Sequence, residues 1–498
     1  MKRLTKIVAL LLALLMCIPV LIACKKNDED KSKNTETISI DPSTMSDLDK
    51  RKLEKDNLPD WVSTKYQGRT ITTYSFHENY ELDINGYNEY TGSKVHDLVY
   101  KRNCIVESRL GITFDNIKSP AGHHSEFGKE LGILANAQSG DYDVIYTMGN
   151  SAVSSGVEHI YFTDVTTLEY LSIDSPWWNR QAMENQSFDG KHLRYLVGDI
   201  TLTTYNKAGA IFVNSVEYTN RYQEGLDGLY DIVIDGKWTI DVLLQKSKES
   251  YLDVYDDGLD DDGNDFIGFG IGNPVRVKAL EYGFDVRRWS RDDEGFVKLD
   301  FDLERASIAV DKMIKLLFES PGTYYDASSY LSQKSFARGN MLFYENQLGS
   351  IMGTDFRDMD EDFGVLPTPK LDENQEEYTT EIQESSTFVV IPEMCPDKEF
   401  ASVVVEALCA ESYRQVILPY LEECLKIQYV RESRAGKIID IILDSANKDY
   451  FGLNNPGGAG KLITNTVIME VNRLSSNYRT VASMAEAALR EIKTTYYS

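Results

Sequence analysis

The stretch Asp143-Val-Ile-Tyr-Thr-Met-Gly-Asn-Ser151 runs from largely apolar residues into a small polar turn. A short apolar run of this kind is typical of a strand that is buried on both faces. Residues 69–76 and 112–117 form similar runs, and helical spacing of apolar residues over 96–110 and 126–137 separates the three strands. This order of strand, helix, strand, helix and strand predicts a parallel sheet covered by helices.

The carboxyl ends of these strands mark a place for a ligand. In open parallel sheets, ligands bind in the crevice outside the carboxyl ends of the strands. Ser75, Phe76, His77 and Asn150 end or follow two of the predicted strands. The topology alone therefore puts these residues near any site that the sheet forms.

The later part of the chain continues with strands and helices. Further extended segments are predicted at residues 201–211, 336–344, 363–369 and 387–392. Thr239 is a good N-cap for a helix that begins at the next residue. From residue 397 to the end, apolar residues recur at helical spacing, which predicts a mostly helical C-terminal region.

The N-terminus has the layout of a secretion signal. Basic residues precede an apolar run from Ile7 to Ile22, which is too short for an ordinary transmembrane helix. The run ends in Leu21-Ile22-Ala23-Cys24, which resembles the bacterial lipoprotein signal, in which the cysteine receives lipid. Lipid chains on Cys24 would hold the protein at the outer face of the membrane. The alternative is a plain signal peptide that happens to contain a cysteine.

Composition excludes several classes of function. The chain has 498 residues, enough for about two or three domains. Its formal net charge of −27 repels phosphate backbones and anionic lipid, so neither nucleic-acid binding nor adhesion through basic patches is expected. The 6 histidines and 6 cysteines are few for a zinc enzyme or a disulfide scaffold.

Four cysteines remain once Cys24 is lipidated. They are Cys104, Cys395, Cys409 and Cys424, and none has the spacing of a Cys-x-x-Cys motif. Three disulfide pairings are open to them, but isolated core thiols are the favoured interpretation.

Several short segments together carry a resemblance to a known family. They are Gly140-Asp-Tyr-Asp-Val144, Pro176-Trp-Trp-Asn179, Leu196-Val-Gly-Asp-Ile200, Phe212-Val-Asn-Ser215, Gly236-Lys-Trp-Thr239 and Phe363-Gly-Val-Leu-Pro-Thr-Pro369. In this order and behind a lipoprotein signal, they make the chain from about residue 60 resemble family 1 extracellular solute-binding proteins. These are the substrate-capturing lipoproteins of ABC importers, many of them for sugars.

The resemblance implies an α/β fold of two periplasmic-binding-protein-like lobes, with a central ligand cleft and crossing hinge strands. Such lobes close on a ligand by hinge motion. The expected organisation is a signal peptide at residues 1–23, a flexible tether at 24–59, lobe 1 at 60–197 plus 392–431, and lobe 2 at 203–387 plus 432–498. The crossings are expected near residues 198–201 and 387–391.

Sugar capture needs flat aromatic faces and polar side chains that bond hydroxyl groups. Trp177 and Trp178 are the aromatic candidates, although packing between the lobes is the alternative for either ring. Asn150 matches a position where the family contacts its ligand. The remaining ligand-binding candidates are Asp199 and Tyr205 at the expected hinge, and Tyr344, Glu345 and Gln347 after a lobe-2 strand.

Enzyme motifs are missing from the sequence. No Gly-x-Ser-x-Gly, His-Glu-x-x-His, Walker A or Gly-x-Gly-x-x-Gly pattern occurs. We therefore expect no catalytic residues and no bond chemistry. A secreted, lipid-anchored glycoside hydrolase or lyase is the alternative, because the many carboxylates could include an acid and base pair.

The sequence thus predicts a monomeric lipoprotein at the extracellular face of the cell membrane. It captures a small solute, with carbohydrate favoured, and hands it to the permease subunits of an ABC transporter. Peptides and other solutes stay open.

An acidic loop follows the expected start of lobe 2. Residues 253–265 contain seven aspartates and one asparagine around glycine turns, and Ca²⁺ takes six to eight such oxygens. The candidate ligands are Asp253, Asp257, Asp261 and Asp265. The match to an EF-hand is imperfect because Tyr255 and Asn264 occupy ligand positions. The alternatives are a structural calcium site and a solvated acidic turn, and no other cofactor is expected.

If the loop holds structural calcium, removing the metal should destabilise the protein, because a ligand that binds only the folded state raises its stability. A chelator should then lower the melting temperature, and added Ca²⁺ should restore it. An identical melting temperature with and without chelator would rule the metal out.

Overall fold

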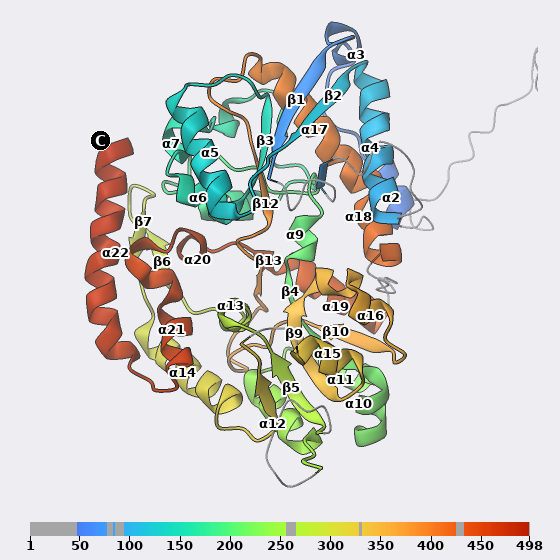
Figure 1. The fold of residues 1–498 in the computed structure, drawn as a ribbon, viewed down its shortest axis with the longest axis vertical. Helices are drawn as coiled ribbons and strands as arrows, with labels where there is room; N and C mark the ends of the chain where they lie inside the picture. Colours follow the sequence, from blue (N-terminus) through green and yellow to red (C-terminus); the bar gives the residue numbers. More distant parts are fainter. Residues whose placement is uncertain are drawn as a thin grey trace, which may run out of the picture. The chain divides into compact units, whose positions relative to one another are not determined.

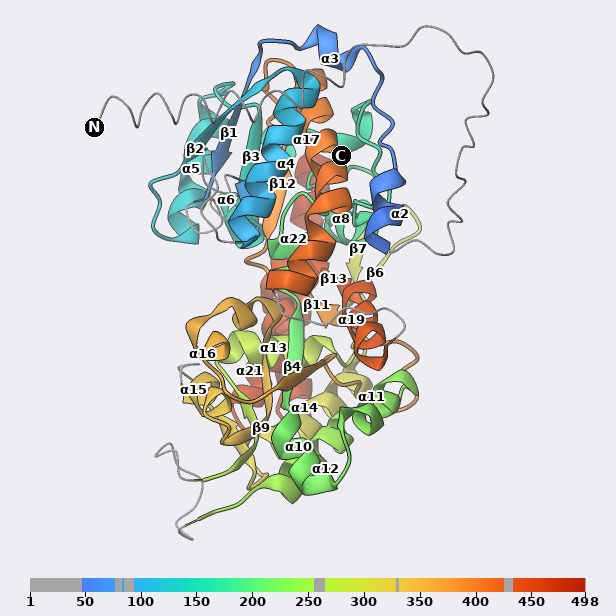
Figure 2. The same cartoon turned by 90° about the vertical axis from the view of Figure 1, so that its right-hand side faces the viewer.

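A computed structural model describes residues 47–76, 83–84, 94–254, 265–327, 331–424 and 433–497. The chain divides into a unit that ends at Asp47 and a second unit from Leu48 to Ser498. The second unit has two lobes, each built around its own sheet (Figures 1 and 2).

The sheet of lobe 1 confirms the predicted parallel core. Its strands are β1 (Thr70–Ser75), β2 (Thr113–Lys118), β3 (Val144–Met148) and β12 (Thr387–Val390), in the order β12-β3-β1-β2. β1 pairs in parallel with both β2 and β3, and β12 joins the edge in antiparallel. Every residue of β3 is buried, as its apolar run predicts.

Helices cover this sheet on both faces. The lobe-1 helices are α3 (Val62–Lys65), α4 (Lys94–Leu110), α5 (His124–Asn136), α6 (Gly149–Ser155), α7 (Glu158–Tyr161), the 3₁₀ turn η4 (Val165–Thr167), α8 (Arg180–Gln186) and α17 (Lys398–Gln415). α4 and α17 pack against each other although they lie far apart in the sequence. The two helices predicted between the first three strands are α4 and α5.

Lobe 2 has a mixed sheet in the order β10-β4-β9-β5-β8. Its strands are β4 (Gly209–Asn214), β5 (Ile267–Ile271), β8 (Thr323–Tyr325), β9 (Met341–Gln347) and β10 (Phe363–Leu366). β5 pairs in parallel with β8 and β9, whereas β4 is antiparallel to its two neighbours. The carboxyl ends of β5, β8 and β9 therefore lie at one edge.

The helices of lobe 2 enclose a second large core. They are α10 (Ser215–Tyr222), α11 (Leu226–Ile234), α12 (Ile240–Ser250), α13 (Pro274–Tyr282), α14 (Leu303–Leu317), α15 (Leu331–Ala337), the 3₁₀ turn η5 (Leu348–Met352), α16 (Thr354–Arg357), α19 (Arg434–Asp444) and α21 (Leu462–Ile468). Thr239 caps α12 as predicted, because its hydroxyl accepts the N–H of Val242.

The chain passes between the lobes in three places. The first is residues 198–203, and the second is residues 382–386, which lead into β12. The third follows α17, where α18 (Ile417–Pro419) and the π-helical turn η6 (Tyr420–Cys424) pack on the lobe-2 core. The limits of the two lobes stay a prediction.

One predicted extended segment is partly helical. Residues 201–211 contain the single turn α9 (Thr203–Asn206) before β4 begins. The turn lets the Tyr205 hydroxyl reach back to the Asp199 carboxylate, which a continuous strand would not allow.

A third, smaller core joins elements from the end of the chain. It contains the hairpin of β6 (Trp289–Arg291) and β7 (Val297–Leu299), with α20 (Tyr450–Asn454), the turn η7 (Pro456–Lys461) and α22 (Leu474–Tyr496). A short parallel pair, β11 (Thr380–Glu381) and β13 (Ala446–Asn447), lies between the two main sheets (Figure 2).

The last part of the predicted tether is ordered. Residues 47–53 form α2 (Asp47–Leu53), and the Arg51 guanidinium lies 4.4 Å from the ring centre of Tyr413. The side chain of Asp56 is buried and forms ion pairs with Arg109 and Arg414. Cys24 and the signal segment lie outside the described residues.

Three described cysteines are free thiols. Cys395 and Cys409 are buried and Cys104 is half-buried, which agrees with isolated thiols for these three. Among the described helices, none combines the length and the apolar character needed to cross a membrane.

Trp177 and Trp178 lie in the core of lobe 1. Their side chains are 2% and 6% exposed. Both indole N–H groups donate to the Glu406 carboxylate, at 3.1 and 2.8 Å, and the N–H of Ser172 donates to it at 3.2 Å. Burial raises the pKa of Glu406 to about 7, against the opposing effect of these donors.

Replacing Glu406 with alanine should destabilise lobe 1, because two buried indole N–H groups and the N–H of half-buried Ser172 lose their acceptor together. We expect a loss of about 2–4 kcal/mol in the free energy of unfolding. Urea denaturation checks this against Glu169→Ala, which removes an exposed carboxylate. An equal loss in both variants would show that the shared acceptor contributes nothing.

Candidate functional site

The parallel strands of both sheets end at the crossing segments. In lobe 1 the carboxyl ends are Ser75, Lys118 and Met148, and in lobe 2 they are Ile271, Tyr325 and Gln347. Such ends are where open α/β sheets bind ligands. The region between the two sets of ends is therefore the candidate solute site.

A buried carboxylate holds the first two crossings together. Asp83 accepts the backbone N–H and the hydroxyl of Thr203, at 3.1 and 3.0 Å, and the hydroxyl of Thr387 at 2.5 Å. Thr203 precedes β4 of lobe 2, and Thr387 begins β12 of lobe 1. Because Asp83 has no exposed surface, burial raises the pKa of its carboxyl group.

Arg102 fixes the same region from α4. It is 2% exposed, and it donates to the carbonyl groups of Ile200 at 2.9 Å and Asp83 at 3.1 Å. It also donates to the hydroxyl of Ser412 in α17 at 3.2 Å. One guanidinium group thus connects the first crossing to two helices of lobe 1.

Asp199 lies in the first crossing and Tyr205 in α9 directly after it, and the hinge role of both stays a prediction. Asp199 is 7% exposed, and the Tyr205 hydroxyl donates to its carboxylate. Burial raises the pKa of Asp199 to about 7, although this hydrogen bond acts in the opposite direction. The two side chains partner each other.

Asn150 sits at the start of α6, directly after β3. Its N–H donates to the Glu384 carbonyl at 3.0 Å, and the N–H of Gly149 donates to the Ser386 carbonyl at 3.1 Å. A side chain at position 149 would place Cβ 2.9 Å from the Glu384 oxygen, so only glycine permits this approach. The side-chain oxygen of Asn150 is buried and has no hydrogen-bond partner among the described residues.

Gln347 approaches the second crossing from lobe 2. It ends β9 opposite Gly209, and the N–H of Leu348 donates to Ala208, which itself bridges to Ile382. The side-chain oxygen of Gln347 is buried and lacks a partner within the described part of the chain. Asn150 and Gln347 therefore adjoin the same crossing from opposite lobes.

Glu345 is buried more deeply in lobe 2 than Gln347, which is half-buried. It has no exposed surface, and its nearest cation is the Arg276 guanidinium at 3.8 Å. Burial raises the pKa of Glu345 to about 8, against the effect of Arg276, and so favours the neutral form of this carboxyl group. Tyr344 lies in the lobe-2 core, where its ring packs with those of Phe212 and Phe336.

A layer of buried charges lies beneath the second crossing. Lys278 pairs with Glu381 at 3.1 Å and Glu384 at 3.3 Å. Lys448 donates to the Ser386 hydroxyl, and burial lowers its pKa to about 7. These pairs position the crossing that carries the backbone partners of Asn150.

A separate cavity of about 1200 Å³ opens beside α8. Gln181 and Asn185 line it from lobe 1, and the other lining residues come from lobe 2, including residues 374–379 and 444–449. None of the predicted ligand-binding residues lines this α8 cavity. Its arginines are paired: Arg287 with Asp300, Arg288 with Glu281 and Asp449, and Arg305 with Asp372.

The structure describes only part of the acidic loop. Asp257 and Asp261 lie outside the described residues. Asp265 is 3% exposed and accepts the N–H of Val254 at 3.0 Å, and Asp253 is half-buried. No metal-binding group of three or more His, Cys, Asp or Glu side chains occurs among the described residues. Calcium binding stays a prediction.

The sequence made Trp177 and Trp178 candidates for the cleft, with packing between the lobes as the alternative, and the structure buries both rings in lobe 1. The reason is Glu406, which accepts both indole N–H groups from a position far along the chain. Asp83 and Arg102 were missed, because no motif surrounds a residue that acts through distant threonines and carbonyls.

The raised pKa of Asp199 predicts a pH dependence. Its folded pKa of about 7 lies above the ordinary value of 3.8 for an aspartate, so the folded state binds more protons between these values, and its stability falls as the pH rises toward 7. In Asp199→Asn, which keeps an acceptor for Tyr205, the loss of unfolding free energy between pH 5 and 8 should be smaller by about 1–3 kcal/mol. Urea denaturation at both pH values checks this, and equal losses in both proteins would contradict it.

Comparison with known proteins identifies the fold. No family model and no curated protein matches the chain. An ABC transporter solute-binding protein from Thermotoga lettingae, bound with α-D-tagatose, is similar in structure, with 13% identity and a TM-score of 0.54 over 85% of this chain and 100% of that one. A cyclo/maltodextrin-binding protein complexed with maltotetraose has 11% identity and a TM-score of 0.54 over 89% of this chain and 100% of its own.

UgpB from Mycobacterium tuberculosis, in complex with glycerophosphocholine, is a third match. It is 11% identical with a TM-score of 0.54, and the match covers 85% of this chain and 98% of that one. The first two are binding proteins by their descriptions, and the third is described in complex with glycerophosphocholine. The two sheets, the crossing segments and these matches confirm the expected fold: the chain has the two-lobe α/β fold of ABC-transporter solute-binding proteins.

Proposed function

We propose that this protein captures a carbohydrate or a polyol outside the cell and delivers it to the permease of an ABC transporter. The observation that carries this proposal is a pair of buried amide oxygens, Asn150 Oδ1 and Gln347 Oε1, at the crossing between two separate sheets; neither has a partner in the part of the chain that the structure describes. They adjoin the strand ends where such sheets bind ligands.

The chemistry of the site favours hydroxyl groups. Amide oxygens accept hydrogen bonds from hydroxyl donors without requiring a charged ligand. The nearby charges are largely matched, since Lys278 pairs with Glu381 and Glu384, and burial of Glu345 favours its neutral form. The net charge of −27 also disfavours an anionic solute. The ligands named for two of the similar structures, tagatose and maltotetraose, are carbohydrates.

Capture proceeds by closure of the lobes over the solute. Part of the binding free energy drives closure, and the permease distinguishes the closed, loaded form from the open one. Asp83 contacts both crossings, so it belongs to the part of the molecule about which the lobes turn.

Anchoring at the cell surface completes the proposal. Lipid on Cys24 would hold the protein at the outer membrane face, and the polar residues after it would form a tether. A captured solute would then stay close to the permease.

A ligand screen tests the function directly. The mature protein is heated with a panel of monosaccharides, oligosaccharides and polyols, and one ligand class should raise the melting temperature, because it binds the folded state. Peptides and glycerophosphodiesters complete the panel. If no carbohydrate or polyol stabilises the protein, or if the sugar is converted to products over time, the proposal fails.

Matched variants locate the site. Asn150→Ala and Gln347→Ala should each weaken binding of the ligand found in the screen by about 5–10-fold, the loss of one hydrogen bond. Asn185→Ala and Asn374→Ala remove amides from the α8 cavity and serve as controls. Calorimetry measures all four affinities. Loss of affinity in the controls alone would move the site to the α8 cavity.

A further inference from the structure

The third core belongs with lobe 2, because α22 packs on α14 and α21, and it also contacts lobe 1 away from the crossings. The lobe-1 side is residues 184–192, the end of α8 and the turn after it, which lie between Met183 and Leu193 of the lobe-1 core. Between them, Phe188 leaves this core and enters the small third core, with 2% of its surface exposed. We call the contact of residues 184–192 and α7 with the β6–β7 hairpin and α22 the second interlobe contact.

Three aromatic rings of the third core surround the Phe188 ring. Its ring centre lies 5.5 Å from that of Tyr497, 5.6 Å from Phe296 and 6.2 Å from Tyr450. None of these three residues comes from lobe 1. Separation of the lobes here would expose the Phe188 ring and the rings around it to water.

Arg291 of β6 adds a polar seam. Its guanidinium donates to the carbonyl groups of Glu184 at 2.7 Å, Ser187 at 3.0 Å and Phe188 at 3.3 Å. The same carbonyl of Phe188 accepts the N–H of Val297 in β7 at 2.8 Å. Hydrogen bonds from a charged donor are the stronger kind, and several converge on one side chain here.

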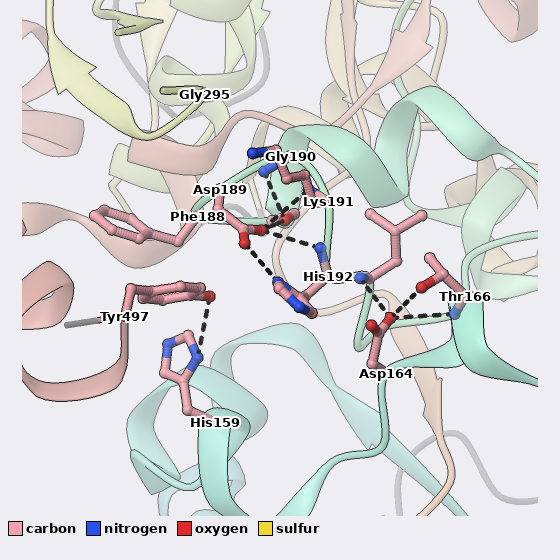
Figure 3. Close-up of polar contacts among 12 residues, drawn as sticks. His159, Asp164, Thr166, Phe188, Asp189, Gly190, Lys191, His192, Gly295 and Tyr497 are labelled. Atoms are coloured by element: carbon pink, nitrogen blue, oxygen red, sulfur yellow. Dashed lines mark hydrogen bonds and ion pairs between the residues drawn. The ribbon is translucent and has the colours of Figure 1, made fainter. Parts of the chain in front are cut away.

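The lobe-1 loop is shaped to receive Arg291. Gly190 has a positive φ of 68°, and a Cβ at this position would lie 2.9 Å from the centre of the guanidinium group. Asp189 holds the turn by accepting the N–H groups of Lys191 and His192, both at 3.0 Å (Figure 3). Burial opposes its ionisation, but these donors and the His192 ring lower the pKa of Asp189 to about 2.

The end of α22 reaches lobe 1 as well. Figure 1 shows this long helix running from beside α14 toward α7. The ring of Tyr496 stacks on His159 of α7 with centres 4.3 Å apart, and the Tyr497 hydroxyl lies 3.4 Å from His159 Nδ1 (Figure 3).

We propose that the second interlobe contact is a second pivot, which restricts the lobes to rotation about the line that joins it to the crossing segments. A body held at one hinge can bend and twist, whereas a body held at two separate places turns only about the line between them. The inference rests on the proposed function only in its consequence for solute binding.

The consequence for solute binding is that the ligand-free protein samples a narrower range of lobe arrangements. If the open protein samples fewer arrangements, less conformational freedom is lost when the lobes close over a ligand. Release of the contact should therefore broaden the distribution of distances between the lobes and weaken solute binding together.

Distance measurements between two labels test the pivot without a ligand. Spin labels on genetically encoded ketone side chains replace Lys129 in α5 and Thr354 in α16, both of which are exposed. In Arg291→Ala, and in the double variant Tyr496→Ala with Tyr497→Ala, the distribution in the ligand-free protein should be wider than in the parent. Lys298→Ala, which removes an exposed cation from β7 of the same hairpin, should keep the parent width.

An unchanged distribution in both contact variants would overturn the proposal, provided that circular dichroism shows folded protein. If Arg291→Ala does not fold, the tyrosine variant decides alone, because Tyr496 is 41% exposed and Tyr497 is only partly buried against the third core. With the ligand from the screen, affinity should fall about fivefold or more. If no solute binds at all, the proposed solute capture is contradicted, whereas the distance distributions still test the second pivot.

Discussion

The carboxylate of Asp83 is the constraint on which the two-lobe arrangement depends. It accepts hydrogen bonds from Thr203, where the chain enters lobe 2, and from Thr387, where it returns to lobe 1. Two segments that are far apart in the sequence are thereby held as one unit. Arg102 attaches this unit to α4 and α17, so both crossing segments are fixed to lobe 1.

The same crossing region contains many polar groups, and only some of them have a hydrogen-bond or ion-pair partner among the described residues. Lys278 and its two glutamates satisfy one another, and Asp199 has Tyr205. Asn150 and Gln347 keep buried oxygen atoms without partners among the described residues. Buried polar atoms are nearly always paired, which is why these two oxygens mark the candidate site.

The sequence predicted the fold more fully than the site. Periodic apolar runs located β1 to β3 and their helices, since local pattern and burial agree there. It failed at α9, where a contact between Tyr205 and Asp199 overrides the extended pattern. It made Trp177 and Trp178 candidates for the cleft, because nothing near them in the sequence indicates that Glu406 binds both rings. Topology placed Asn150 at a strand end, and its contact with a ligand stays a prediction. Arg291 and Phe188 act through partners that only the folded chain brings near.

The edge strand β12 has a consequence for how the protein forms. β12 completes the lobe-1 sheet beside β3, yet the ribosome makes it only after all five strands of the lobe-2 sheet. Until then β3 has a bare edge, and such edges invite pairing with other chains. Contacts between distant segments also fold slowly. If the chain is exported unfolded, we expect it to depend on chaperones that cover the edge of β3 until β12 has been made.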